Sequence, residues 1–317
     1  IHMILIILNL FMSNILIIKH GSLGDIVQIS GALLDIRTHY KNKKIYILTT
    51  SKYKNLFESC PYIDEVLIDK RLPRWNFFYL LNLIKVIRKF DFENCFDLQN
   101  SSRTEFYRKN FKIKNWSSSR TILKEGESKK IFDQNGVIER FKIQLDRSGL
   151  SNTSNVLKPD FSWAIDNDFE IKEKQYIFLA PFCSPKLQHK VWPYFKELIE
   201  LLKQNFKNHE ILTAPGPSEI GFCKDLKLKI ILDKDKPTSI NQLSKIIKQA
   251  SFVIANDTGP AHIAAHLNVK GIALFGGHTS AKKVSIETNN FKVIEKDSLV
   301  KLTVTEVLES VIRQFST

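Results

Sequence analysis

The sequence predicts an α/β fold made of two successive halves, each with its own open parallel sheet. Short apolar runs rich in isoleucine alternate with helical patterns, as βαβ units require. The alternation stops in a polar, irregular segment between about residues 150 and 174 and then restarts. In addition, 317 residues exceed what one core comfortably supports. We therefore expect an N-terminal domain over residues 1–155, a linker over 156–175 and a C-terminal domain over 176–317 that ends in a helix.

The first half begins with an apolar stretch, Met3–Ile18, that is shorter than the roughly 20 residues of a membrane helix. It has no basic flank or cleavage site of a secretory signal. We interpret Met12 as an alternative start, which leaves Met3–Phe11 as an upstream extension and makes Asn14–Lys19 a buried strand. The elements expected next are helix Asp25–Tyr40, strand Lys44–Thr49, helix Lys52–Cys60, strand Glu65–Ile68, helix Trp75–Phe90, strand Cys95–Leu98, a polar turn at Gln99–Arg103 and another helix.

The second half repeats the alternation. In such sheets ligands bind beyond the carboxyl ends of the strands, so we expect the site there. The expected elements are strand Tyr176–Leu179, helix Trp192–Asn205, strand Glu210–Thr213, helix Pro217–Leu228, helix Ile240–Gln249, strand Phe252–Ala255, helix Gly259–Leu267, strand Gly271–Phe275 and helix Val304–Gln314.

Composition and charge narrow the function class. The chain is 43% hydrophobic and 25% charged, which argues against disorder, collagen-like repeats and a multispanning membrane protein. Forty-seven Lys and Arg against 33 Asp and Glu give a net charge of +14. This charge is compatible with nucleic acid, an anionic membrane surface or phosphorylated substrates. The four cysteines form no C-x-x-C pair, which favours a reduced cytoplasmic protein without a zinc or thiol-exchange motif.

A first motif, Gly-Ser-Leu-Gly-Asp at residues 21–25, follows a strand and opens a helix. Its glycines allow close backbone approach, and the free amides of a helix N-terminus favour an anion. It is neither the G-x-G-x-x-G dinucleotide fingerprint nor a P-loop. A plain strand–helix turn with Asp25 as the cap explains the motif equally well.

A second motif, Asn-Asp-Thr-Gly-Pro-Ala-His at residues 256–262, also follows a strand. Asp257 or Thr258 can cap the next helix, and the amides of Thr258, Gly259 and Ala261 are expected to face a phosphate or diphosphate. His262 and His266 have the i, i+4 spacing of metal ligands, but the glutamate of H-E-x-x-H is missing. We therefore reject a zinc hydrolase and interpret His266 as structural.

A third motif is the loop from Ala180 to Lys190, just before an expected helix. Lys190, with the Ser184 hydroxyl upstream, would be a cationic anchor for a phosphate; the alternative is an ordinary solvated lysine. Farther along, Glu219 follows another strand, where its carboxylate can bond a ribose hydroxyl or only cap the next helix.

Together these motifs resemble glycosyltransferase family 9, the ADP-heptose:lipopolysaccharide heptosyltransferases. The resemblance spans nearly the whole chain through NILIIKHGSLGDIV, FDLQNSSRT, KVWP, APGPSE and VIANDTGPAHIAAHLNVKGIALFG, of which the last is the most specific. It implies the GT-B fold, with two facing Rossmann-like domains. The first would bind the acceptor and the second the nucleotide-sugar, with no metal and no cofactor.

The resemblance also implies roles for particular residues. Asp25 would be the general base that takes the acceptor proton in a single inverting displacement. Lys190 and Ser184 would neutralise the departing diphosphate, which the amides at Thr258 and Gly259 would also hold. Glu219 would bind the ribose. The nucleotide-sugar set is thus Ser184, Lys190, Glu219, Asp257, Thr258, Gly259 and His262, in which Asp257 and His262 shape the loop.

On the acceptor side, the implied residues are Gly24, Arg71, Arg74 and Arg103. Residues 70–79 combine basic and aromatic side chains, which suits a surface bearing anionic head groups. A partly buried helix with snorkelling bases is the equally weighted alternative. The chain departs from the family after residue 276, where the usual P-T-D-P is Gly-His-Thr-Ser at 277–280. That departure leaves the sugar and the base open.

The leading hypothesis is heptosyl transfer from ADP-heptose to a phosphorylated or acidic glycolipid of the lipopolysaccharide inner core. The enzyme is expected to be a monomer at the cytoplasmic face of the inner membrane, held to its anionic surface peripherally and binding no nucleic acid. The alternatives are a transferase with another nucleotide-sugar, a nucleotide-sugar epimerase of the same fold, and a non-enzymatic protein that binds anionic surfaces.

Overall fold

The computed structural model describes residues 13–315, and the chain divides into two compact units. The first unit holds the described residues up to Ser22 and residues 29–159. The second unit holds residues 23–28 and everything from Asp160 onward. The predicted upstream extension Met3–Phe11 lies outside the described residues. No helix within residues 13–315 is both long enough and apolar enough to cross a bilayer.

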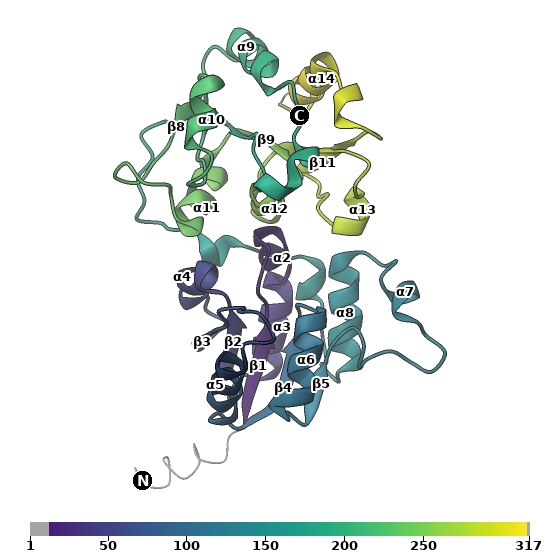
Figure 1. Ribbon diagram of the computed structural model, residues 1–317. Helices are drawn as coiled ribbons and strands as arrows, with labels where there is room; N and C mark the ends of the chain where they lie inside the picture. The colour runs from purple at the N-terminus through teal and green to yellow at the C-terminus, as the bar shows by residue number, and fades with distance from the viewer. Residues whose placement is uncertain (1–12, 316–317) are drawn as a thin grey trace. The chain divides into compact units, whose positions relative to one another are not determined.

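The first unit is built on a parallel sheet of five strands in the order β3-β2-β1-β4-β5 (Figure 1). Its central strand, β1, is apolar at every position from Ile15 to Ile18 and is fully buried, as a strand covered on both faces must be. The strands are β1 (Asn14–Ile18), β2 (Ile45–Thr49), β3 (Glu65–Ile68), β4 (Phe92–Asp97) and β5 (Asn115–Ser117).

Helices pack on both sides of this sheet (Figure 1). On one side, α5 buries Leu80, Leu83 and Ile87, whose i, i+3, i+7 spacing puts them on one helix face against β1, β2 and β4. The helices are α3 (Ser30–His39), α4 (Lys54–Glu58), α5 (Phe77–Arg88), α6 (Ser102–Phe111), α7 (Lys129–Phe132) and α8 (Val137–Arg147), with 3₁₀ turns η1 (Ser51–Tyr53) and η2 (Asn155–Leu157).

The prediction of one helix over Asp25–Tyr40 is wrong. The chain makes α2 (Leu23–Gln28), turns at Ile29, where ψ is −3°, and restarts as α3. By contact, α2 belongs to the second unit and α3 to the first. The first helix after β1 is therefore a short element tied to the unit that carries the other motifs.

The second unit has a parallel sheet of six strands in the order β11-β10-β9-β6-β7-β8. The strands are β6 (Tyr176–Ala180), β7 (Glu210–Thr213), β8 (Lys229–Ile230), β9 (Phe252–Asn256), β10 (Gly271–Phe275) and β11 (Phe291–Glu295). The helices are α2, α9 (Phe195–Asn205), α10 (Ile220–Asp225), α11 (Ile240–Gln249), α12 (Gly259–His266), α13 (Ala281–Val284) and α14 (Val304–Phe315), with 3₁₀ turns η3 (Ser162–Ala164), η4 (Pro185–Lys190) and η5 (Leu299–Lys301).

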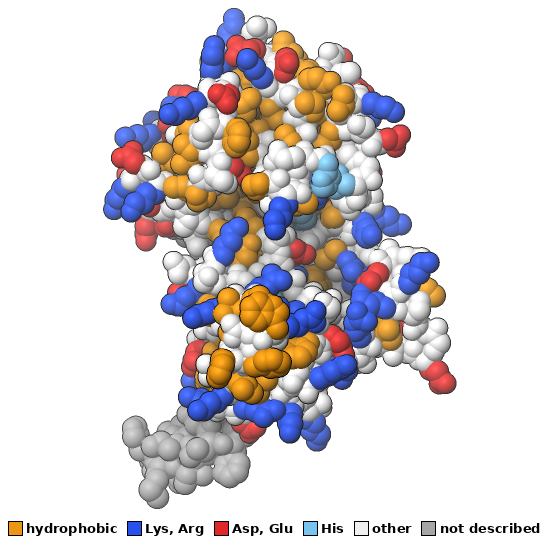
Figure 2. All heavy atoms as spheres, in the orientation of Figure 1, with side chains coloured by type: hydrophobic (Ala, Val, Ile, Leu, Met, Phe, Trp, Pro, Cys, Tyr) orange, Lys and Arg blue, Asp and Glu red, His pale blue; other side chains and the backbone are white. Residues whose placement is uncertain are grey.

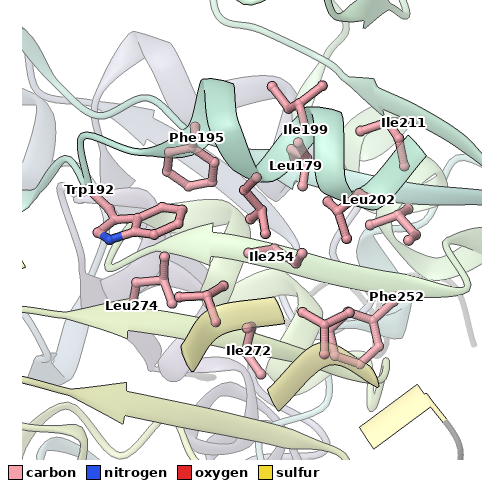
Figure 3. Close-up of a cluster of buried hydrophobic side chains, with 14 of the residues drawn as sticks. Leu179, Trp192, Phe195, Ile199, Leu202, Ile211, Phe252, Ile254, Ile272 and Leu274 are labelled. Carbon is pink, nitrogen blue, oxygen red and sulfur yellow. The ribbon is translucent and has the colours of Figure 1, made fainter. Parts of the chain in front are cut away.

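A layer of apolar side chains joins α9 to the sheet of the second unit (Figure 3). Trp192 precedes this helix instead of opening it, because α9 begins only at Phe195. The indole lies in the core at 1% exposure and donates its Nε1–H to Leu302 O at 2.8 Å. The loop before α9 is thus anchored by a buried side chain, which fixes the position of the residues just upstream.

In both sheets the chain reverses its direction of strand addition once. In the first unit the reversal lies between β1 and β4, and in the second between β6 and β9. The loops that leave two such strands diverge and form a crevice at the carboxyl edge, where ligands of open α/β sheets bind. The second and third sequence motifs follow β9 and β6, so they meet at this point.

Candidate functional site

Asn256, the last residue of β9, clamps the loop that follows β6. Its side-chain Nδ2 donates to Pro181 O at 2.8 Å, and its side-chain Oδ1 accepts from Trp192 N at 3.0 Å. The side chain is fully buried, so these bonds are protected from water. Both ends of the loop that carries Lys190 are therefore tied to the end of the neighbouring strand.

Lys190 and Asp257 form an ion pair at this switch point, with Nζ 2.5 Å from Oδ2. The carboxylate is almost buried, at 5% exposure, whereas the lysine keeps 20%. The alternative of an ordinary solvated lysine is therefore wrong. Both residues were predicted to lie near a phosphate, but their ion pair with each other was not predicted.

A third side chain completes this cluster. His278 Nε2 lies 2.9 Å from the same oxygen, Asp257 Oδ2. Burial alone would raise the pKa of Asp257, but the hydrogen bonds from Lys190 and His278 lower it below the ordinary aspartate value. Asp257 is therefore a carboxylate near neutral pH. His278 was noticed in the sequence only as a departure from the family pattern.

His262, on α12, lies next to this cluster, with its Nε2 4.0 Å from Asp257 Oδ1. Burial lowers its pKa more strongly than the nearby carboxylates of Asp257 and Asp25 raise it, so the ring is neutral near pH 7. One turn on, burial lowers the pKa of His266 to about 3. His266 is thus a neutral core residue, in line with its interpretation as structural.

Asp25 is the third residue of α2 and is partly exposed. Two glycines allow α2 to lie against α12. A Cβ on Gly24 would come within 2.6 Å of the His262 ring, and one on Gly259 within 2.7 Å of the Leu23 side chain. Close helix contact of this kind explains why each motif carries a glycine at that position. It also brings Asp25 into the electrostatic surroundings of His262.

The start of α12 differs in detail from the prediction. Thr258 is the N-cap residue, but its side chain makes no capping bond and donates to Asn256 O at 3.3 Å. The Ala261 amide donates to Thr258 O at 3.1 Å, so the prediction that it is available to a phosphate is wrong. The amides of Thr258 and Gly259 remain the predicted anion ligands at this helix start.

Glu219 lines a pocket in the same unit, and Ser184 lies in the chain between two other lining residues, Cys183 and Pro185. Glu219 accepts a hydrogen bond from Gly216 N at 2.7 Å and makes no side-chain cap on α10, so the capping alternative is wrong in that form. Ser184 is exposed at the start of η4. The pocket has a volume of about 490 Å³, and its lining includes Phe182, Trp192, Phe195, Glu219 and Phe222.

The predicted acceptor residues lie in the first unit, except Gly24. Arg71 and Arg74 precede α5 and are exposed, whereas the Arg103 guanidinium makes hydrogen bonds within the first unit. Arg103 donates to Tyr107 Oη at 2.9 Å and to Leu72 O at 2.6 Å. Arg103 therefore holds the 71–72 loop, and its acceptor role stays a prediction.

A buried network under this loop was not predicted. Asp69, directly after β3, accepts from Tyr107 Oη at 2.6 Å and from Tyr79 Oη, and it lies 3.0 Å from His20 Nε2. Burial raises its pKa, but these hydrogen bonds outweigh burial and hold the pKa well below the ordinary value. The available signal was position, because Asp69 and His20 both follow the carboxyl ends of strands.

The outer face of α5 and the turn before it carry large apolar side chains that are exposed to water. Trp75 is 75% exposed, Phe77 72%, Phe78 85% and Leu81 62%. Figure 2 shows hydrophobic side chains bordered by Lys and Arg over this part of the first unit. The alternative of a partly buried helix fits only the inner face, because the outer aromatics are not buried.

Metal-ligand groupings were also sought in the described part of the chain. Residues 13–315 contain no group of three or more His, Cys, Asp or Glu side chains arranged to hold a metal ion. All four cysteines are buried and free.

Residues 98–303 match the family model of glycosyltransferase family 9 (heptosyltransferase). Lipopolysaccharide heptosyltransferase 1 of Campylobacter coli is 25% identical over 329 residues, which cover 93% of this chain and 92% of that protein.

Two solved Escherichia coli structures share the fold at 17% identity and a TM-score of 0.74. One is ADP-heptose lps heptosyltransferase II, matched over 96% of this chain and 98% of that one. The other is heptosyltransferase WaaC with ADP, matched over 95% and 99%. The predicted α/β fold of GT-B type is thereby confirmed.

Proposed function

Because this chain belongs to glycosyltransferase family 9, we propose that it transfers a heptose from ADP-heptose to an inner-core acceptor of lipopolysaccharide. The observation that carries the proposal is the cluster at the switch point of the second unit, where Lys190 stands beside the start of α12. A lysine and a helix N-terminus are suited to a diphosphate leaving group. The named E. coli relatives, one solved with ADP, support ADP as the nucleotide.

The donor would occupy the second unit. Its diphosphate would lie against Lys190, the amides of Thr258 and Gly259, and the Ser184 hydroxyl. The apolar pocket of about 490 Å³ suits a nucleoside, with Glu219 at its side for a ribose hydroxyl. This arrangement supplies positive charge from the protein itself, which supports metal-independent transfer.

The chemical step would be a single displacement. The acceptor oxygen attacks the anomeric carbon, and its proton goes to the Asp25 carboxylate. The bond from the anomeric carbon to the diphosphate oxygen breaks, and the electron pair leaves with ADP. Attack opposite the leaving group inverts the configuration. Asp25 would also stabilise positive charge that develops on the sugar in the transition state.

Nucleotide selectivity tests the donor assignment. We expect isothermal titration calorimetry to show saturable ADP binding at least about tenfold tighter than UDP or GDP binding, because a fitted pocket separates bases by a kcal/mol or more. Tighter binding of UDP or GDP would contradict ADP-heptose as the donor. An epimerase of this fold would instead consume the donor with no acceptor present.

We also propose that the first unit docks on an anionic membrane at the cytoplasmic face, where its glycolipid acceptor lies. The exposed side chains of Trp75, Phe77, Phe78 and Leu81 would enter the interface. Arg71, Arg74 and other nearby bases would meet acidic head groups, each contributing about 1 kcal/mol. The remaining surplus of the +14 charge would add a general attraction to an acidic leaflet.

Vesicle binding tests this surface. Replacing Trp75, Phe77 and Phe78 together by serine is expected to weaken binding to vesicles with anionic lipid by more than about tenfold, since each buried aromatic contributes roughly 1.5–3 kcal/mol. ADP affinity should not change. The control is the pair Ile131→Ala and Leu157→Ala, which removes exposed apolar side chains elsewhere in the first unit. Equal loss in the control, or none in the triple variant, would contradict the proposal.

A further inference from the structure

We propose that His278 is a positioning residue that holds Asp257 so that Lys190 can turn to the donor diphosphate. This inference rests on the proposed function. The starting observation is that two donors, Lys190 Nζ and His278 Nε2, share one carboxylate oxygen, at 2.5 and 2.9 Å. Only one of these donors is needed to keep that oxygen hydrogen-bonded.

Because Asp257 is buried, the number of its hydrogen-bond donors matters. The Asp257 side chain is 5% exposed, so water cannot replace a lost partner, and an unpaired carboxylate there is strongly disfavoured. If Lys190 were its only donor, movement of the ammonium to a phosphate would leave the Asp257 carboxylate without a hydrogen-bond donor. With His278 in place the carboxylate stays hydrogen-bonded, and Lys190, the more exposed partner, is available for an anionic ligand.

The hydrogen bond from His278 does not depend on its protonation state. An ionised carboxylate only accepts, so His278 Nε2 must carry the proton. That proton is present in the neutral Nε2–H tautomer and in the imidazolium alike. The ring is held by neighbours: it stacks on Phe275 at 16° and meets His189 edge-on, with centroids 5.5 Å apart.

His278 reaches Asp257 from the loop that follows β10. It lies in the Gly-His-Thr-Ser segment at 277–280. The residues beside it in the cluster, Lys190 and Asp257, lie within the matched motifs. The loop after β10 therefore adds a second donor to a carboxylate that directly follows β9.

A double-mutant cycle with ADP as the probe tests the inference. By calorimetry, His278→Ala is expected to weaken ADP binding by about tenfold, the size of one charge-assisted hydrogen bond, because the buried carboxylate retains Lys190. In a Lys190→Ala background the same change should have almost no further effect. His278→Gln, whose side-chain amide can donate, should restore most of the affinity.

Controls separate this role from general effects. Lys282→Ala removes an exposed charge from nearby α13 and should leave ADP affinity unchanged. Circular dichroism should show that each variant is folded. Unchanged affinity in His278→Ala, or an equal loss in both backgrounds, would overturn the inference while Lys190-dependent ADP binding still upheld the proposed function. A parent protein that binds no ADP would overturn both.

Discussion

Replacing Asp25 by alanine is expected to lower kcat by about 10²–10⁴-fold while ADP affinity stays nearly the same. The carboxylate is partly exposed on α2, and its charge acts on His262. We propose no contact between Asp25 and the nucleotide. Its proposed work is done only in the transition state, where it takes the acceptor proton. An interaction of that kind changes kcat and leaves the affinity for product nucleotide alone.

The measurements are ADP release under saturating donor and acceptor, and calorimetry with ADP. Asp25→Asn is the matched variant, because it keeps the size of the side chain and removes the base. Circular dichroism should show that both variants are folded, since the close approach of α2 to α12 is made at Gly24 and Gly259. Loss of ADP binding together with activity would show instead that Asp25 is structural.

Lys190→Ala is expected to weaken ADP binding by roughly 10- to 100-fold, the range for losing a charged hydrogen-bond donor to a phosphate. Adenosine has no diphosphate, so its affinity should not change. This comparison assigns the lost free energy to the phosphates. Lys186→Ala, an exposed lysine in the same loop, is the control and should bind ADP normally.

Removal of Lys190 also leaves Asp257 with His278 as its remaining donor, so the single variant is expected to be less stable than the parent. Adding Asp257→Asn removes the buried charge and should recover thermal stability without recovering ADP affinity. Unchanged ADP affinity in Lys190→Ala would reject the phosphate role. Recovery of affinity in the double variant would show that the loss came from misfolding.

Strand ends were the most predictable part of the fold. The expected bounds of Glu65–Ile68, Glu210–Thr213 and Gly271–Phe275 match β3, β7 and β10, because apolar runs between polar turns define buried parallel strands. Three strands were missed. β5 (Asn115–Ser117) and β8 (Lys229–Ile230) are too short for periodicity, and β11 (Phe291–Glu295) is an edge strand in which only the first residue is buried. α8 was missed although its apolar face is regular.

The site was predictable only where one motif defines it. Lys190 and Asp257 were both selected, since each follows a strand end near glycine, proline or a helix start. Their pairing spans 67 residues and depends on Asn256 clamping the loop, which local patterns do not record. The Asp69 network spans β3, α5 and α6 in the same way. Long-range pairing of polar groups is set by topology, so it required the structure.

Transfer of heptose from ADP-heptose is tested by measuring ADP release with a lipid A–Kdo acceptor. We expect ADP to form only when donor and acceptor are both present, with one glycosylated acceptor for each ADP. Asp25→Ala should reduce that rate by the factor given above. Turnover with a UDP- or GDP-sugar but none with ADP-heptose, or donor consumption without an acceptor, would contradict the account.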